Sequence, residues 1–191
     1  MKFITLFGPP GGGKGTTAKM LAQKLAYVHL STGDVFRERA KISDPLGLQI
    51  KGLIDDGRYV PDDITVRVVE EFVTESRSHY EGIIFDGFPR TLEQVRPFER
   101  LQHQGDTNVI ILLHVEEKAL ISRLLKRAGE DQRTDDSSLE TIQKRIETFK
   151  TLTLPVIEHY ADRYLLSTIV GTGKTPEQVS DETYTLISAM M

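Results

Sequence analysis

A glycine-rich stretch from Gly8 to Thr17 constrains this chain of 191 residues more than any other feature. It reads Gly-Pro-Pro-Gly-Gly-Gly-Lys-Gly-Thr-Thr, after an apolar run at 3–7 and before a segment, 18–25, with apolar residues at helical spacing. This order of strand, loop and helix fits the phosphate-loop pattern, with Lys14 as its lysine. Glycines let successive backbone N–H groups point at one centre, and the following helix adds its positive end. The stretch therefore predicts a binding site for a polyphosphate.

The loop departs from the commonest form of the pattern at one position. Gly15 follows Lys14 where Ser or Thr is usual, and the hydroxyl groups come at Thr16 and Thr17. A flexible turn that binds nothing is the alternative interpretation. The length of the motif and its place between a strand and a helix disfavour that alternative.

The composition excludes several classes of protein. Hydrophobic residues make up 39% of the chain and charged residues 27%, as in soluble globular proteins. The net charge of −4 disfavours a broad nucleic-acid interface. The absence of cysteine excludes disulfides and thiolate-bound zinc. No apolar run reaches membrane-spanning length and no signal peptide precedes the first apolar run, so we expect a cytoplasmic protein that binds no membrane.

Five apolar segments alternate with helical ones, which predicts an α/β fold with a five-stranded, parallel, doubly wound sheet. The expected strands are 3–7, 27–30, 82–86, 108–115 and 165–169. Such sheets bind ligands at the carboxyl edge of their strands, where Gly8, Ser31 and Asp86 are expected.

Two interruptions of this alternation predict smaller units. The helical segments between 33 and 57 have no strand between them, so 31–60 is expected to form an inserted helical lobe. A helix is expected at 116–127, and the polar segment 128–136 after it is predicted to be a mobile loop. The core then comprises 1–30, 61–126 and 137–191, with a long helix at 138–163 that is expected to break near Pro155.

Several motifs resemble those of the adenylate kinase family. They are Gly8–Thr16, Ser31–Arg37, Asp86–Gln94, Arg133–Asp136 and Gln143–Arg145. Their order and spacing cover nearly the whole chain and are more specific than the phosphate loop alone. The resemblance implies reversible, Mg²⁺-dependent transfer of the γ-phosphoryl group of ATP to AMP, which gives two ADP. It also implies a core, an AMP-binding lobe and a short lid at 127–136, and we expect a monomer.

The resemblance assigns residues to two nucleotide sites. Those implied for ATP are Gly11, Gly12, Gly13, Lys14, Gly15, Thr16, Arg123, Arg127 and Gly173. Those implied for AMP are Thr32, Arg37, Arg58, Tyr59, Val60, Gly87, Phe88, Pro89, Arg90, Gln94, Arg133 and Arg145. The implied catalytic residues are Lys14, Arg90, Arg127, Arg133 and Arg145. No direct protein ligand of Mg²⁺ is assigned, and Asp86 is expected to act through metal-bound water.

Physical chemistry agrees with this set of residues. Two nucleotides that react phosphate to phosphate bring concentrated negative charge together, so catalysis is mostly positioning and neutralisation. Arginines form forked bonds to phosphate oxygens, and an anionic phosphate needs no general base. The amide of Gln94 can both donate and accept, as the edge of adenine requires.

The chain departs from the family pattern in length at three places. The segment between Arg127 and Arg133 is short, like that of the short-lid members, and the zinc-bearing long lid is excluded because cysteine is absent. The segment between Asp136 and Arg145 is one residue longer than the pattern, and so is the segment after Gly173.

Other functions remain as alternatives. A UMP/CMP kinase would have the same fold, with an asparagine-rich sequence where this chain has Thr91 to Gln94. A GTPase-type switch would need the tetrapeptide Asn-Lys-x-Asp, which does not occur. An inactive nucleotide-binding regulator is disfavoured because the chain retains Lys14, Arg90, Arg133 and Arg145.

Some acidic residues also have structural alternatives. Asp86 could accept hydrogen bonds from Lys14 or from loop N–H groups. Asp135 and Asp136 could cap the next helix, and the family pattern suggests that they also hold the lid closed.

Overall fold

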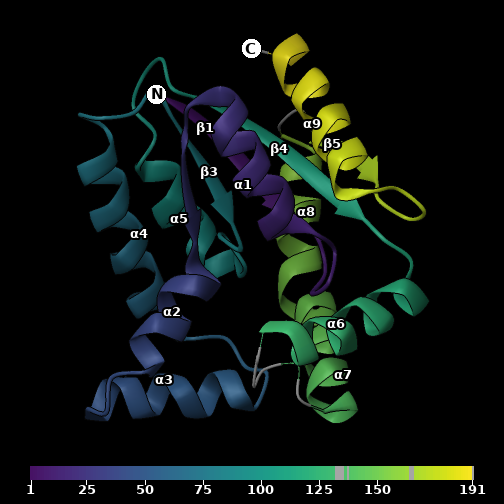
Figure 1. Cartoon of the computed structure of the whole chain (residues 1–191). Helices are drawn as coiled ribbons and strands as arrows, with labels where there is room; N and C mark the ends of the chain where they lie inside the picture. Colours follow the sequence, from purple (N-terminus) through teal and green to yellow (C-terminus); the bar gives the residue numbers. More distant parts are fainter. Residues whose placement is uncertain (132–135, 137, 164–165, 191) are drawn as a thin grey trace.

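A five-stranded parallel sheet forms the centre of the computed structural model, which describes residues 1–131, 136, 138–163 and 166–190 (Figure 1). The strands are β1 (Lys2–Phe7), β2 (Val28–Ser31), β3 (Gly82–Asp86), β4 (Thr107–His114) and β5 (Leu166–Val170). Their order across the sheet is β2-β3-β1-β4-β5, and every pairing is parallel. The predicted fold class is confirmed.

Helices connect the strands and cover both faces of the sheet. They are α1 (Lys14–Leu25), α2 (Thr32–Ala40), α3 (Pro45–Asp55), α4 (Asp62–Ser76), α5 (Leu92–Arg100), α6 (Glu117–Asp131), α7 (Leu139–Thr148), α8 (Leu154–Ala161) and α9 (Pro176–Met190). A π-helical turn, η2 (Phe149–Thr153), joins α7 to α8. No helix among the described residues is long and apolar enough to cross a membrane.

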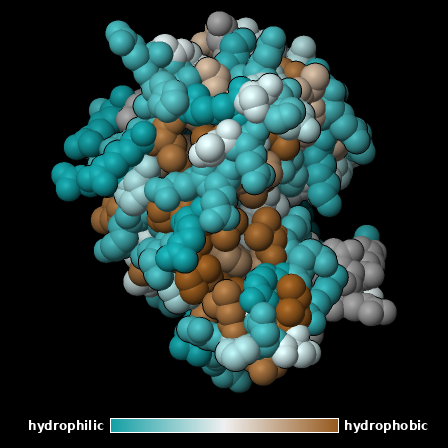
Figure 2. Space-filling view, turned by 90° about the vertical axis from the view of Figure 1, so that its left-hand side faces the viewer, coloured by the Kyte–Doolittle hydropathy of each residue, from teal (hydrophilic) through white to brown (hydrophobic). Residues whose placement is uncertain are grey.

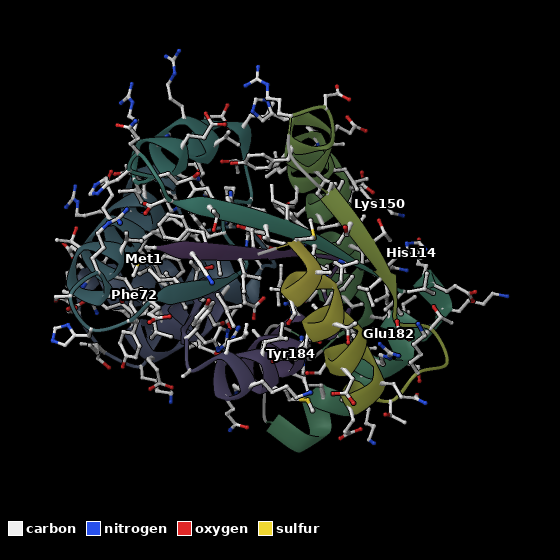
Figure 3. All side chains as sticks on the ribbon, turned by 90° about the horizontal axis from the view of Figure 1, so that it is seen from above. Met1, Phe72, His114, Lys150, Glu182 and Tyr184 are labelled. Atoms are coloured by element: carbon white, nitrogen blue, oxygen red, sulfur yellow. The ribbon has the colours of Figure 1, made fainter. Side chains whose placement is uncertain are left out.

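Alternate residues of β1 supply the two halves of the core. Phe3 and Phe7 face a cluster built with α4, α5, η2 and α8, whereas Ile4 and Leu6 face a cluster built with α1 and α9. Because both faces are covered, β1 is apolar at nearly every position. Seen from above, the sheet lies between α5 and α8 on one side and α1 and α9 on the other (Figure 3).

The register places the carboxyl ends of the strands together. Asp86 pairs with Leu6 of β1 on one side and with Ser31 of β2 on the other. The glycine-rich loop follows β1 directly, so these three strand ends meet at one edge, as predicted.

The segment 31–60 has a small apolar cluster of its own. Phe36, Ile50 and Val60 are its buried members, and Ile64 and Val68 of α4 pack against them. The cluster therefore extends past the predicted lobe boundary into α4. Toward the lower end of the face shown in Figure 2, where this lobe lies, apolar residues reach the surface.

The prediction that the helix at 116–127 ends at Arg127 is wrong, because α6 continues to Asp131. Ala and Glu favour helices, so the polarity of 128–131 does not end one. Of the predicted lid, 132–135 lies outside the described residues. The sequence also predicts a helix from Thr91 toward Gln104, and this prediction is too long because α5 ends at Arg100.

Candidate active site

The glycine-rich loop has backbone positions that suit only glycine. Gly13 precedes α1 with a φ of 88°, a left-handed conformation that side chains rarely adopt. A Cβ on Gly8 would lie 2.7 Å from the carbonyl oxygen of Leu113 on β4. The loop is thus held against the sheet, with its chain leading into the N-terminus of α1.

Lys14 begins α1, and its ammonium group lies under the loop. Its Nζ donates to the carbonyl oxygens of Gly8 at 2.8 Å and Pro9 at 3.0 Å. The pKa of Lys14 is lowered from its ordinary value of 10.5 to about 8, mainly by burial; Asp86 opposes this shift, and Arg90, Arg127 and Arg145 contribute to it. The site therefore concentrates positive charges, and a bound anion would reduce the repulsion between them.

Two pockets lie on either side of this loop. The first is lined by Lys14 and by most of the residues predicted for AMP, namely Thr32, Arg37, Arg58, Tyr59, Val60, Gly87, Pro89, Arg90, Gln94 and Arg145. The second is lined by most of those predicted for ATP, namely Gly11, Gly12, Gly13, Thr16, Arg123 and Arg127. Most residues predicted for AMP therefore line one pocket, and most residues predicted for ATP line the other.

Three predicted residues do not line these pockets. Phe88 is buried in the core, where its ring packs on Phe98. Gly15 faces Asp86, since a Cβ there would lie 3.2 Å from Asp86 Oδ2. Gly173 forms a turn with a φ of 76° between two residues that do line the second pocket. Arg133 lies outside the described residues.

The loop after β3 fixes Arg90 from below. Arg90 Nε donates to the carbonyl oxygen of Gly87 at 2.7 Å, and Thr32 Oγ1 donates to the same oxygen at 2.8 Å. Gly87 has a φ of 81°, and a Cβ there would come within 2.3 Å of Arg90 Nη2. The left-handed backbone favours glycine here, and the absence of a side chain lets the guanidinium lie directly over the backbone.

Gln94 is held at both ends of its amide. Its Oε1 accepts from the backbone N–H of Arg90 at 2.7 Å, and its Nε2 donates to Asp62 Oδ1 at 2.6 Å. Asp62 also accepts from Thr91 Oγ1 at 3.0 Å. Only 1% of Gln94 is exposed, although it lines the first pocket. Such a fixed amide suits recognition of a heterocyclic base.

Asp136 joins one arginine from each pocket. Its Oδ2 accepts from Arg127 Nε at 2.8 Å and Nη2 at 2.6 Å, and its Oδ1 accepts from Arg145 Nη1. Asp136 is fully buried. It does not cap the next helix, because Ser138 caps α7 by accepting from the backbone N–H of Thr141 at 3.1 Å. Arg145 thus reaches the site despite the additional residue before it.

Comparison with known proteins identifies the relationship. The adenylate kinase family model matches residues 6–165. The adenylate kinase of Cyanothece sp. is 42% identical over 173 residues, covering 90% of this chain and 88% of that protein. The adenylate kinase of Thermus thermophilus is 38% identical, covering 92% and 91%, and that of Micrococcus luteus 37% identical, covering 100% and 91%.

The chain belongs to the adenylate kinase family. It is therefore related to nucleoside monophosphate kinases, which are phosphotransferases. The names of these relatives support the adenylate kinase interpretation over the UMP/CMP kinase alternative.

Magnesium, which adenylate kinases use with ATP, fits the chemistry of the loop region. Asp86 is the carboxylate that faces the first turn of α1, and Lys14 bonds to backbone carbonyls instead of to it. No group of three or more His, Cys, Asp or Glu side chains in the described part of the chain could hold a metal ion. Mg²⁺ commonly binds through one carboxylate and substrate phosphates, so a single acidic residue here is appropriate.

His29 lies beneath this carboxylate. Its Nε2 is 3.9 Å from Asp86 Oδ2, and burial lowers the pKa of the ring, although Asp86 opposes this effect. We expect the imidazole to be mainly neutral at pH 7, so it adds no positive charge beside Asp86.

Sequence reasoning missed three residues of this adenylate kinase site. The sequence marks Asp62 only as an acid suited to a helix N-terminus, and its bond to Gln94 has no local sequence signal. Thr153 reaches the first pocket through the π-helical turn η2, which sequence patterns do not mark. Lys126 lines the second pocket, and its position beside Arg127 on α6 was a usable signal.

Proposed function

We propose that this protein catalyses reversible transfer of the γ-phosphoryl group of ATP to AMP, giving two ADP. The observation that carries the proposal is the pair of pockets that share one phosphate loop. Lys14 lines the first pocket, whereas the loop glycines before it line the second. Two nucleotides bound on either side of this loop would meet phosphate to phosphate.

The reaction needs no proton acceptor in this arrangement. An oxygen of the AMP phosphate attacks the γ-phosphorus of ATP while the bond from that phosphorus to the β,γ-bridging oxygen breaks, and ADP leaves with the bond electrons. The residues that would neutralise the transferred group are Lys14, Arg90, Arg127 and Arg145, with Arg133 as an expected fifth. When bound with ATP, Mg²⁺ would supply further neutralisation, held through water by Asp86.

The acceptor base would be read by Gln94. The bonds to Asp62 and to the backbone of Arg90 leave one amide hydrogen and one lone pair of Gln94 for a base. Adenine offers an acceptor ring nitrogen beside an amino group, which matches that pair. Guanine offers a carbonyl oxygen where adenine has its amino group and a protonated nitrogen where adenine has an acceptor, so both hydrogen bonds to the fixed amide would be mismatched.

A coupled assay with ATP and each nucleoside monophosphate tests the proposal. We expect phosphorylation of AMP to exceed that of UMP, CMP and GMP by at least tenfold in kcat/KM, because each mismatched buried hydrogen bond costs about 1–3 kcal/mol. Gln94→Ala should raise KM for AMP more than KM for ATP. Comparable rates with UMP or CMP would contradict the proposal and favour the pyrimidine kinase alternative.

We further infer a monomeric enzyme in the cytoplasm, without zinc. Light scattering at micromolar concentration checks the monomer, and fractionation of the source cells checks the compartment.

A further inference from the structure

Arg90 is restrained by contacts with its neighbours in the first pocket. Its guanidinium carbon lies 4.9 Å from the centre of the Tyr59 ring, which is the geometry of a cation–π contact. On its other side, Arg90 Nε is bonded to the carbonyl oxygen of Gly87. The bond at Nε does not use the two terminal amino groups, which form the fork that binds phosphate oxygens.

The hydroxyl of Tyr59 continues this restraint into the core. Tyr59 Oη lies 3.0 Å from Thr153 Oγ1, and Thr153 Oγ1 donates to the carbonyl oxygen of Arg90 at 2.9 Å. A threonine hydroxyl has one hydrogen, so the hydrogen between the two hydroxyls comes from Tyr59. Tyr59 therefore contacts Arg90 directly through its ring and indirectly through its hydroxyl.

The three residues come from separate parts of the chain. Tyr59 lies between α3 and α4, where the helical lobe returns to the core, Arg90 follows β3, and Thr153 ends η2. All three line the first pocket, and Thr153 is 4% exposed. A π-helical turn often marks a functional position, and here it places the Thr153 hydroxyl between the other two residues.

We propose that Tyr59 is a positioning residue that acts through Arg90, so that the phosphate-binding fork of Arg90 is correctly oriented only when the helical lobe is docked. This inference rests on the proposed function, since Arg90 is assigned there to the transferred phosphate. It differs from the sequence-based prediction, in which Tyr59 contacts AMP itself.

Two substitutions at Tyr59 separate the ring from the hydroxyl. Tyr59→Leu removes both contacts, and we expect it to lower kcat/KM for AMP roughly 3- to 30-fold, as loss of a desolvated cation–π contact would, with KM for ATP unchanged. Tyr59→Phe keeps the ring, so its decrease in log(kcat/KM) for AMP should be less than half of that in Tyr59→Leu. Thr153→Val removes the hydroxyl and should lower kcat/KM for AMP about as much as Tyr59→Phe. Thr153→Ser keeps the hydroxyl and should have the wild-type kcat/KM.

A matched control exists on the opposite face of the sheet. Tyr184 on α9, labelled in Figure 3, also lies near a cation, with Lys24 Nζ 5.8 Å from its ring centre. Tyr184→Leu removes a comparable contact away from both pockets, so it should leave KM for AMP and kcat unchanged.

The Arg90→Ala background distinguishes positioning from direct contact with AMP. If Tyr59 acts through Arg90, Tyr59→Leu should change AMP affinity, measured by calorimetry, less than twofold in that background. An equal loss in both backgrounds would overturn the proposal and show that Tyr59 binds the nucleotide. Wild-type kinetics for Tyr59→Leu would also overturn it.

A measurement without nucleotide keeps this test independent of the proposed function. In NMR spectra of the free protein, the side-chain protons of Arg90 should carry an upfield ring-current shift in the wild type and in Tyr59→Phe. The shift should disappear in Tyr59→Leu, with Arg90→Lys identifying the signal. An unshifted wild-type signal overturns the inference, whereas a shifted signal in a protein that does not phosphorylate AMP overturns only the proposed function.

Discussion

The side-chain amide of Gln94 donates to Asp62 Oδ1 at 2.6 Å, and this bond determines which way the amide faces. A carboxylate has only acceptors, so it attracts the NH₂ group of Gln94, while the backbone N–H of Arg90 requires the oxygen at the other end. The bond at the NH₂ group and the bond at the oxygen therefore require the same orientation of the amide. The amide is thus set before any base arrives, which lowers the ordering needed on binding.

Removing Asp62 should relax the choice of base. In Asp62→Ala the amide of Gln94 loses its fixed partner, and we expect the ratio of kcat/KM for AMP over GMP to fall roughly 5- to 100-fold, the range for one unsatisfied buried hydrogen bond. Asp63→Ala is the control, because Asp63 is exposed and contributes the same charge to the first turn of α4. Equal ratios in the two variants would show that Asp62 acts only through the helix dipole.

ATP binding should take up protons above pH 8. The pKa of Lys14 is lowered to about 8 by burial, so part of the population is neutral at pH 8.5, and a bound polyphosphate favours the charged form. Calorimetric titration with ATP in buffers of different ionisation enthalpy should show this uptake at pH 8.5 and less at pH 7. Lys14→Met should abolish it, and equal uptake in that variant would assign the protons elsewhere.

The same lysine makes a signed contribution to stability. Between about pH 8 and its ordinary value of 10.5, Lys14 binds fewer protons in the native state than in the unfolded chain. The free energy of unfolding contributed by Lys14 therefore rises with pH across this window and is constant below it. Urea unfolding of the wild type and Lys14→Met should differ most at pH 7 and converge toward pH 10. A constant difference would contradict the lowered pKa.

Asp136 should be more important for stability than a surface acid. In Asp136→Ala, the guanidinium groups of Arg127 and Arg145 lose their shared counterion, which we expect to lower the free energy of unfolding by about 3 kcal/mol. The thermal midpoint should fall by roughly 6–12 °C. Asp181→Ala breaks an ion pair in which Asp181 is 69% exposed, and should change stability by less than about 1 kcal/mol.

A polyanionic ligand tests the electrostatic explanation of this effect. Because the phosphates would replace the missing carboxylate, an inhibitor that joins both nucleotides should reduce the difference in thermal midpoint between the wild type and Asp136→Ala. A difference that the inhibitor leaves unchanged would mean that Asp136 stabilises the fold by packing.

The sequence predicted the features that depend on local chemistry. A glycine-rich loop between a strand and a helix is encoded within ten residues, so the position of Lys14 followed from the pattern. The order of the apolar segments likewise predicted the parallel sheet. The family resemblance separated residues of the two pockets, because its motifs carry spatial information that periodicity lacks.

Features that depend on side chains meeting across the fold could not be predicted. Tyr59 and Thr153 are separated by 94 positions, and their bond exists only because η2 turns one residue toward the other. The partner of Gln94 is likewise on a different helix. The end of α6 was misjudged because polar residues were interpreted as a loop, although helix formation depends on propensity and packing.

The contact of the helical lobe with α7 depends on a residue without a side chain. Gly57 has a φ of 71°, and a Cβ there would lie 3.0 Å from Arg145 Cγ and 3.3 Å from the carbonyl oxygen of Thr141. Gly57→Ala should lower the free energy of unfolding by about 1–2 kcal/mol because of the left-handed backbone. It should also lower kcat, because Arg145 must shift away from Asp136 and from the first pocket.

Gly52→Ala is the matched control for this last substitution. Gly52 lies in α3, five positions away, where an added Cβ meets no atom within 4 Å. That variant should gain about 0.5–1 kcal/mol of stability from helix propensity and keep its kcat. The thermal midpoint should therefore fall in Gly57→Ala and rise in Gly52→Ala. In the coupled assay, only Gly57→Ala should lose turnover. If Gly57→Ala loses stability but keeps full turnover, the contact with Arg145 is structural and does not set the position of its guanidinium.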